Sequence, residues 1–266
     1  MRKAKLSIWM TLLICIFFIG CSPETDTDKK ITPIKILVYN EAKECIGEML
    51  MDDYGNLIKQ HLESGDVTED STIEYEYDKS GNILRKHYQS ENDTYTEEHV
   101  YDKSGNAIKT THHRETSSFT HSYVDECEYD QYGNITLRKH TQNDQEPTIT
   151  EYIYTYEGEQ ILTCETITDG KQISTTEYTY DTNGNITKSS NSLSAAKVIN
   201  IIETEYDEHN NATKKATTMI MDSTEQVMIL EYENEYDDEA RLIRTTQYVT
   251  ENGERQFAAD YEYIYE

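Results

Sequence analysis

Tyr77-Asp78-Lys79-Ser80-Gly81-Asn82 is the stretch of sequence that decides the fold, because variants of it recur along the whole chain. Close copies are found at Tyr101–Asn106, Tyr129–Asn134 and Tyr180–Asn185. Looser copies are found at Met51–Asn56 and Tyr206–Asn211, and two worn copies begin at Tyr156–Gly158 and Tyr236–Asp238. Successive copies start between 24 and 30 residues apart. Self-similarity with a period of this length is typical of an array in which one supersecondary unit packs against the next.

The six-residue string, here called the hexad, predicts a tight turn. Its Asp can accept a hydrogen bond from the backbone two residues later, and its Gly supplies the positive φ that a reversal requires. The copy at Tyr206–Asn211 has Asn210 in place of Gly, which the left-handed region tolerates. The predicted turn residues of the five clearest copies are Asp52 and Gly55, Asp78 and Gly81, Asp102 and Gly105, Asp130 and Gly133, and Asp181 and Gly184.

The segments that lead into the turns alternate with a period of two, which is typical of a strand with unlike faces. Tyr75 and Tyr77 lie on one side, for example, and Glu74 and Glu76 on the other. Glu is concentrated before the turns and Lys or Arg after them. Folding at each Gly then sets an acidic arm beside a basic one, so that Glu74 can face Lys86. Solvated strand faces without a pairing role are the alternative.

These patterns predict an all-β fold, a repetitive antiparallel β-hairpin meander of roughly 16–18 strands. The chain has 22 Tyr but only 4 Phe, so a long twisted or curled sheet with tyrosine ladders suits it better than a compact sandwich. The sequence does not decide whether such a sheet closes. We expect the last segment, Tyr261–Glu266, to be a free edge protected by Asp260, Glu262 and Glu266.

The first residues have the organisation of an export signal. Arg2, Lys3 and Lys5 precede an apolar run that ends at Phe18-Ile19-Gly20-Cys21, an ending that resembles a bacterial lipobox. The resemblance implies lipidation of Cys21, anchoring to a membrane, and a place in the bacterial cell envelope on the extracytoplasmic side. The expected domains are a lipoprotein signal peptide at 1–20, a lipidated cysteine and flexible tether at 21–33, and one β-hairpin repeat domain at 34–266. We expect no disulfide among Cys45, Cys127 and Cys164.

The string Tyr-Asp-x-x-Gly-Asn-Ile resembles the YD repeats of the Rhs, teneurin and insecticidal-toxin shell proteins. Tyr77, Asp78, Gly81, Asn82 and Ile83 carry the match, which extends in repeat units over about residues 47–266. In that family each repeat is a β-hairpin, and many repeats spiral into a hollow shell around a cargo. This chain is much shorter, and it contains neither the autoproteolytic core region nor the variable toxin domain of those proteins.

The composition argues against several kinds of activity. The net charge of −27, from 51 acidic and 24 basic residues, would repel nucleic acid, so we expect no nucleic-acid partner. No catalytic or nucleotide-binding motif is present, and the eight His are dispersed, so we expect no enzyme activity, metal or cofactor. The turn at Asp181 begins as a calcium loop does, but it lacks the Gly and Glu that such a loop needs later.

The tyrosine face is the one feature with a plausible ligand. Rings in a row on a rigid sheet can stack on sugars, although a thin sheet also needs them to hold together. The candidate ligand-facing residues are Tyr75, Tyr77, Tyr152, Tyr154, Tyr178 and Tyr180. The sequence thus favours a membrane-anchored surface lipoprotein, a non-enzymatic repeat scaffold for glycan, cell-wall or protein contact. The alternatives are a glycoside hydrolase with paired carboxylates and a shell subunit of a larger YD-repeat toxin or secretion assembly.

Overall fold

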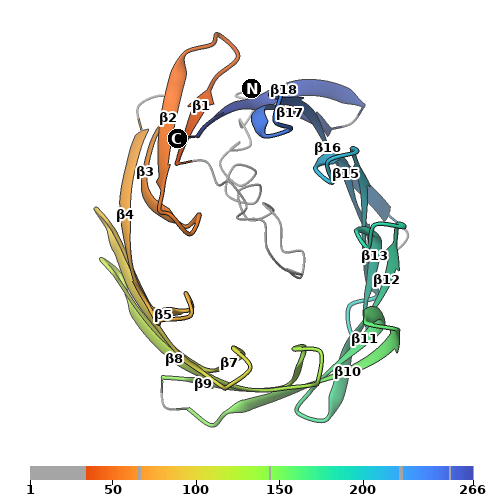
Figure 1. Cartoon of the computed structure of the whole chain (residues 1–266). Coiled ribbons are helices and arrows are strands. Elements are labelled where there is room, and N and C mark those ends of the chain that lie inside the picture. Colours follow the sequence, from red (N-terminus) through yellow and green to blue (C-terminus); the bar gives the residue numbers. More distant parts are fainter. Residues whose placement is uncertain (1–33, 65–66, 144, 222–223, 252, 266) are drawn as a thin grey trace, which may run out of the picture.

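The computed structural model describes residues 34–265, apart from 65–66, 144, 222–223 and 252. These residues form one antiparallel sheet of eighteen strands that follow one another around a ring (Figure 1). The strands are β1 (Lys35–Tyr39), β2 (Cys45–Met51), β3 (Leu57–Ser64), β4 (Val67–Tyr77), β5 (Ile83–Ser90), β6 (Asp93–Tyr101), β7 (Ala107–Thr116), β8 (Thr120–Tyr129), β9 (Ile135–Gln142), β10 (Thr148–Glu157), β11 (Gln160–Thr168), β12 (Lys171–Tyr180), β13 (Ile186–Leu193), β14 (Val198–Tyr206), β15 (Ala212–Met221), β16 (Thr224–Tyr236), β17 (Leu242–Glu251) and β18 (Glu254–Ile264).

The sheet closes on itself, because β1 pairs with β2 on one side and with β18 on the other. The predicted all-β antiparallel meander is therefore confirmed, but the expectation of an open twisted or curled sheet is wrong, since the strands form a closed barrel. The expected free edge at Tyr261–Glu266 is also wrong: Tyr261 and Tyr263 lie opposite Val38 and Ile36. Closure satisfies the backbone groups that an edge strand would leave unpaired.

The hexads form the turns at one rim of the barrel. In the turn after β4, the Asp78 carboxylate accepts hydrogen bonds from the backbone N–H groups of Ser80 and Asn82, at 2.8 and 2.9 Å. Gly81 has a φ of 88° and donates its N–H to the Asp78 carbonyl. Asn210 takes the same left-handed conformation with a φ of 62°. Asp and Gly thus supply the local geometry from which each hairpin follows.

The register assigns each residue to one of the two faces of the wall, because directly opposed residues share a face. Tyr75 lies opposite Lys86, whereas Glu74 lies opposite His87 and Glu76 opposite Arg85. The predicted pairing of Glu74 with Lys86 is thus wrong by one residue. A shift of one residue moves a side chain to the other face. The shift places Lys86 among the tyrosines.

The buried apolar core lies where the first and last strands meet. Ile36 and Val38 of β1 pack there with neighbours from β2, β3 and β18, namely Met49, Leu62, Ala259 and Tyr261. All six are at most 8% exposed. Hydrophobic burial therefore stabilises the closure of the barrel.

A buried carboxylate reinforces the same junction. The Asp260 side chain of β18 is 0% exposed, accepts a bidentate pair of hydrogen bonds from Arg244 of β17, and lies 2.7 Å from Lys43 Nζ in the β1–β2 loop. Burial favours the neutral carboxyl, but hydrogen bonds from Arg244 and Lys43 outweigh that effect and lower the pKa of Asp260 to about 2. Asp260 thus ties the first hairpin to the last two strands.

Candidate functional site

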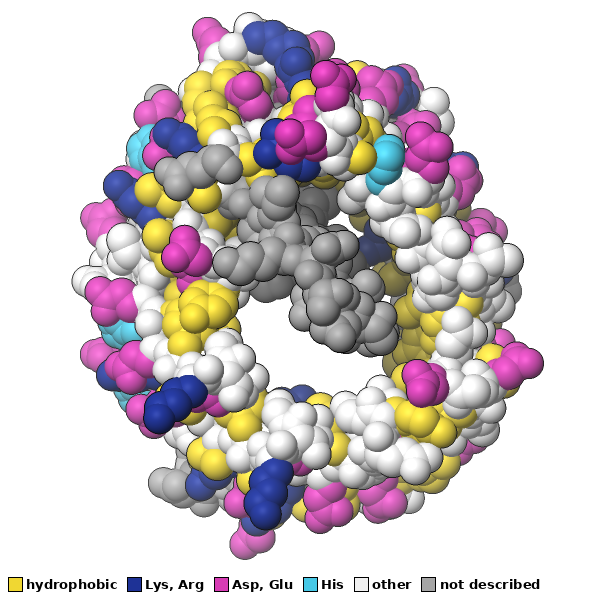
Figure 2. Space-filling model, viewed as in Figure 1, with side chains coloured by type: hydrophobic (Ala, Val, Ile, Leu, Met, Phe, Trp, Pro, Cys, Tyr) yellow, Lys and Arg dark blue, Asp and Glu magenta, His cyan; other side chains and the backbone are white. Residues whose placement is uncertain are grey.

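The two faces of the barrel wall differ in chemistry. Figure 2 shows acidic, basic and histidine side chains around the outside and apolar side chains along much of the hollow. The outward face carries ion pairs between neighbouring strands, such as Lys139 with Glu126 at 2.9 Å and Lys188 with Glu203 at 3.0 Å. The register puts the repeat tyrosines on the opposite, lumenal face. Eighteen strands is a size at which barrels leave a water-filled channel. The lumen is therefore the candidate functional site.

The candidate tyrosines all lie on this lumenal face, and four of their hydroxyls are engaged within the wall. Tyr75, Tyr154 and Tyr180 donate to the backbone carbonyls of Leu57, Ile135 and Ile161, at 3.2, 2.9 and 2.9 Å. Tyr77 donates to the Asp52 carboxylate. Burial raises the pKa of Tyr75 and Tyr154 well above the usual range. These hydroxyls connect each repeat to the previous one.

Tyr152 and Tyr178 lie on the same face, where they are opposite Thr166 and Ser189. Burial raises the pKa of the Tyr178 hydroxyl. The structure therefore brings the six candidate tyrosines onto one face, but it distributes them over β4, β10 and β12 instead of gathering them at one point. Their contact with a ligand stays a prediction.

A second aromatic group, which the sequence analysis did not single out, lies on the lumenal side of β5–β9. Five rings stack in succession from strand to strand: Tyr88, Tyr95, His112, Tyr123 and His140. Their centroids are 4.6 to 5.4 Å apart. Because the rings cover one another, their faces hold the strands together and are largely closed to a ligand. The alternation within single arms could not reveal a contact that crosses five strands.

Charged side chains of the same wall are paired with one another. Arg138 forms a bidentate pair with Asp125 at 2.9 and 2.6 Å, and His140 lies 2.7 Å from the same carboxylate. Arg114 binds Asp93 at 2.8 and 2.5 Å in the same manner. Burial favours the neutral form of Asp125, but hydrogen bonds from Arg138 and His140 outweigh it and lower the pKa of Asp125. The ring-lined part of the lumen on β5–β9 is thus ionic, and its charges neutralise one another.

The lumenal face of β13–β17 carries more apolar side chains, beside uncharged polar residues and Lys215. It carries one apolar side chain or more from each strand, here called the methionine wall: Leu193, Val198, Met219, Met221, Met228, Leu230 and Val249. Leu230 is buried, whereas Met219 and Met221 are 42% and 50% exposed. Nothing in the hexads marks this patch. Met219 and Met221 indicate an apolar patch only when the strand pairing of the closed barrel is known, because that pairing places them on the lumenal face.

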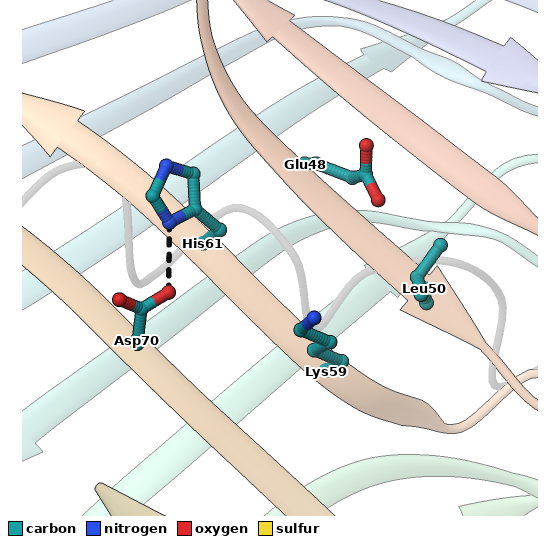
Figure 3. A pocket seen from close by; sticks show the side chains of 5 residues that line it. All are labelled: Glu48, Leu50, Lys59, His61 and Asp70. Carbon is teal, nitrogen blue, oxygen red and sulfur yellow. Dashed lines mark hydrogen bonds and ion pairs between the residues drawn. The ribbon is translucent and has the colours of Figure 1, made fainter.

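A shallow hollow on the outer wall is lined by Glu48, Leu50, Lys59, His61 and Asp70 (Figure 3). Its two carboxylates already have partners: Asp70 lies 2.7 Å from His61 Nδ1, and Glu48 lies 2.6 Å from Lys35. The hydrogen bond that His61 donates to the Asp70 carboxylate is the main cause of the raised pKa of His61. The glycosidase alternative requires an acid and a base directed at a substrate. Paired side chains on an open wall do not supply that arrangement.

No group of three or more His, Cys, Asp or Glu able to hold a metal occurs among the described residues. At the turn considered for calcium, Asp181 accepts hydrogen bonds from the backbone of Asn183 and Asn185, and from the Asn185 side chain. Its oxygens therefore serve the turn. Cys45, Cys127 and Cys164 are free thiols. Cys21, the signal segment 1–20 and the tether 21–33 lie outside the described residues.

No helix in the described part of the chain is both long enough and apolar enough to cross a membrane.

Comparisons with known proteins give structural neighbours only. No protein-family model matches the chain, and no curated protein matches it. A crystal structure of a porin-like protein from Bacteroides uniformis aligns with a TM-score of 0.41 and 14% identity, covering 91% of this chain and 100% of that one. Its counterpart from Bacteroides vulgatus gives 0.38 and 12%, covering 89% and 99%.

A third neighbour is a chain of a mutant Tc holotoxin pore from Photorhabdus luminescens. It aligns with a TM-score of 0.32 and 13% identity over 85% of this chain. The present chain spans only 16% of the length of that toxin chain.

The expected function needs correction. We predicted a lipid-anchored scaffold that displays a tyrosine face for glycan, cell-wall or protein contact. That prediction is wrong, because the sheet closes into an eighteen-strand barrel and closure turns the tyrosine face inward. The shell-subunit alternative fails for the same reason, since a closed barrel has no edge strand on which a larger shell could continue.

Proposed function

We propose that the protein is a non-enzymatic receptacle of the bacterial cell envelope, a hollow barrel that stands in water and holds a small ligand in its lumen. The observation that supports this most is the polarity of the wall. Charged side chains line the outside of the wall, while the repeat tyrosines and the methionine wall face inward, and the lumenal charges of β5–β9 pair with one another (Figure 2). The hexad hairpins, which resemble YD repeats, and the signal-like residues 1–20 support the repeat architecture and the envelope location of this proposal.

The same polarity argues against a barrel that crosses a bilayer. Membrane barrels have an apolar outer band about 25 Å tall and a polar interior. Here the outward side of β12–β15 carries Glu177, Lys188, Glu203 and Lys214. A charged side chain facing lipid at the bilayer midplane costs about 2–4 kcal/mol. Several such charges on adjacent strands make water the favoured surrounding.

Vesicles test the first half of the proposal. The purified protein is added to phospholipid vesicles loaded with a self-quenched dye, and dye release and flotation with the vesicles are measured. We expect no release, at any protein concentration at which the barrel is folded. Release that depends on folded protein would show that the barrel is a membrane pore.

Native mass spectrometry of protein purified from cell-envelope extracts tests the second half. We expect a bound molecule at a ratio of one per barrel. It should be lost in Asn200→Arg, whose side chain enters the lumen, and kept in Ser192→Arg, whose side chain lies on the outward face of the neighbouring strand. Equal occupancy in both variants would place the ligand outside the lumen and contradict the proposal.

A further inference from the structure

We infer that the methionine wall is the ligand-binding site, and that it binds an uncharged apolar molecule of the acyl-chain type. The inference rests on the proposed receptacle function and adds the place and the chemical class. Met219 and Met221 project from β15 into the lumen, at 42% and 50% exposure. Large apolar side chains left open on a concave surface are typical of binding sites.

The register makes the methionine wall continuous. Val198 of β14 lies opposite both Leu193 and Met221, and Leu230 of β16 lies opposite Val249. Met228 extends the patch between them, opposite Thr217. The patch therefore crosses five consecutive strands on one face.

The described methionines show the same bias. All five lie on the lumenal side: Met49 and Met51 belong to the buried cluster at the junction of the first and last strands, and Met219, Met221 and Met228 line the open wall. Methionine has a flexible, polarizable side chain that adapts to irregular apolar shapes. Met49 and Met51 are thus packed against other side chains, whereas Met219, Met221 and Met228 line the open wall and are available to a ligand.

Polarity and enclosure select the occupant. The polar side chains opposite Met219 and Met221, namely Asn200, Gln226 and Thr224, are uncharged, whereas the charged Lys215 lies opposite Leu230. The part of the ligand that contacts the two exposed methionines therefore carries no charge. The patch faces the inside of a closed barrel, so an occupant has to enter the lumen to reach it. A single apolar chain is compatible with both restrictions. The ionic part of the lumen on β5–β9 does not compete for it, because its charges and ring faces contact one another.

The test measures binding of N-phenyl-1-naphthylamine, an uncharged apolar probe that fluoresces when shielded from water. We expect saturable binding to the folded protein and displacement by 1-dodecanol. The variant Met219→Gln/Met221→Gln should bind about tenfold more weakly, because it removes apolar surface from the methionine wall. The matched control Ile199→Gln/Ile220→Gln changes two adjacent apolar residues on the outward face and should stay within about twofold of the parent.

A volume-conserving variant separates binding from folding. Met219→Leu/Met221→Leu keeps the wall apolar and should retain the affinity of the parent. Equal losses in the lumenal and outward pairs, unchanged binding in the lumenal Gln pair, or no probe binding at all would overturn the inference. If the probe fails while native mass spectrometry still shows a lumenal ligand, only the apolar assignment is wrong. Loss of both signals contradicts the receptacle as well.

Discussion

At each repeat boundary a tyrosine hydroxyl continues the connection where the backbone ladder ends. The β5–β6 ladder runs only from Gln89–Thr94 to Arg85–Glu98, and beyond it Tyr101 donates to the Ile83 carbonyl at 2.7 Å. Other boundaries repeat this contact, with Tyr129 to Ala107, Tyr206 to Ile186, and Tyr265 to Leu242. The hydroxyl explains why the repeat carries Tyr where Phe would bury as large a ring.

The fourth residue of the hexad correlates with the acceptor that the tyrosine hydroxyl of the next repeat uses. Where it is aromatic, its ring packs on the tyrosine of the next repeat, and that tyrosine donates to the Asp carboxylate of the same hexad. The three examples are Tyr54 with Tyr77 and Asp52, Tyr132 with Tyr156 and Asp130, and His209 with Tyr236 and Asp207. Burial, followed by the hydrogen bond to Asp130, raises the pKa of Tyr156 to about 12.

Replacing Tyr101 by Phe tests the role of the hydroxyl. The change leaves the Ile83 carbonyl without its donor while the ring remains, so we expect unfolding free energy to fall by about 1 kcal/mol. Urea unfolding followed by circular dichroism measures it. Tyr54→Phe is the control, since Tyr54 is 61% exposed and packs on Tyr77 through its ring. Equal effects of the two changes would refute a stabilising role for the Tyr101 hydroxyl.

Replacing Asp260 by Asn tests the junction of the first and last strands. The folded pKa of about 2 lies below the unfolded value of about 4, so the carboxylate stabilises the barrel above about pH 4 and loses that effect as pH falls through about 2. The shift corresponds to about 2 kcal/mol. Unfolding measured from pH 7 down to pH 2 should show Asp260→Asn less stable at pH 7 and converging with the parent in acid. A pH-independent difference would contradict this account, and Asp70→Asn on the exposed wall is the control.

At the scale of the element, the hairpins depend on left-handed residues at the ends of the turns. Gly105 has a φ of 88°, and a Cβ added there would meet no atom within 4 Å. Any cost of substitution therefore comes from the backbone alone. Ala240 holds the corresponding place in the worn copy that starts at Tyr236, with a φ of 61°. A side chain in this region costs roughly 1–2 kcal/mol.

Exchanging these two residue types gives a prediction with opposite signs. Gly105→Ala should destabilise the barrel by about 1 kcal/mol, and Ala240→Gly should stabilise it by less than that, because Gly also loses more entropy on folding. Thermal unfolding of both variants measures the two shifts. Shifts of the same sign would show that backbone strain at these turns is not the deciding factor.

Much of the hairpin could be predicted because its determinants are local. Asp78 and Gly81 specify their turn within five residues, and the alternation of Glu74, Tyr75 and Glu76 marks a strand without reference to any partner. Each hexad turn also contains a bulge, as between Glu76 and Tyr77, and that extra residue placed Lys86 on the face opposite to the predicted one. A bulge changes the register while leaving the pattern of each arm intact.

At the scale of the whole molecule, closure depends on contacts that are far apart in sequence. Val38 meets Tyr261, and Lys43 meets Asp260, over more than two hundred residues. Neither segment contains a hexad, so the repeat that predicted the meander could not predict where it ends. Closure in turn decides function, because it converts one face of a sheet into a lumen and the other into an outer surface.

The polarity of that closed wall is the central claim, and fluorescence of a single introduced tryptophan tests it most directly. The only natural tryptophan is Trp9, in the predicted signal segment. Ser190 lies on the outward side of β13, opposite Glu177, and its neighbour Ser189 faces the lumen opposite Tyr178. In the presence of vesicles of brominated phospholipid, we predict that the indole of Ser190→Trp is quenched by aqueous acrylamide and not by the lipid, and that Ser189→Trp is shielded from both. Strong quenching of Ser190→Trp by bromine, with protection from acrylamide, would place the outer wall in a bilayer and contradict the account.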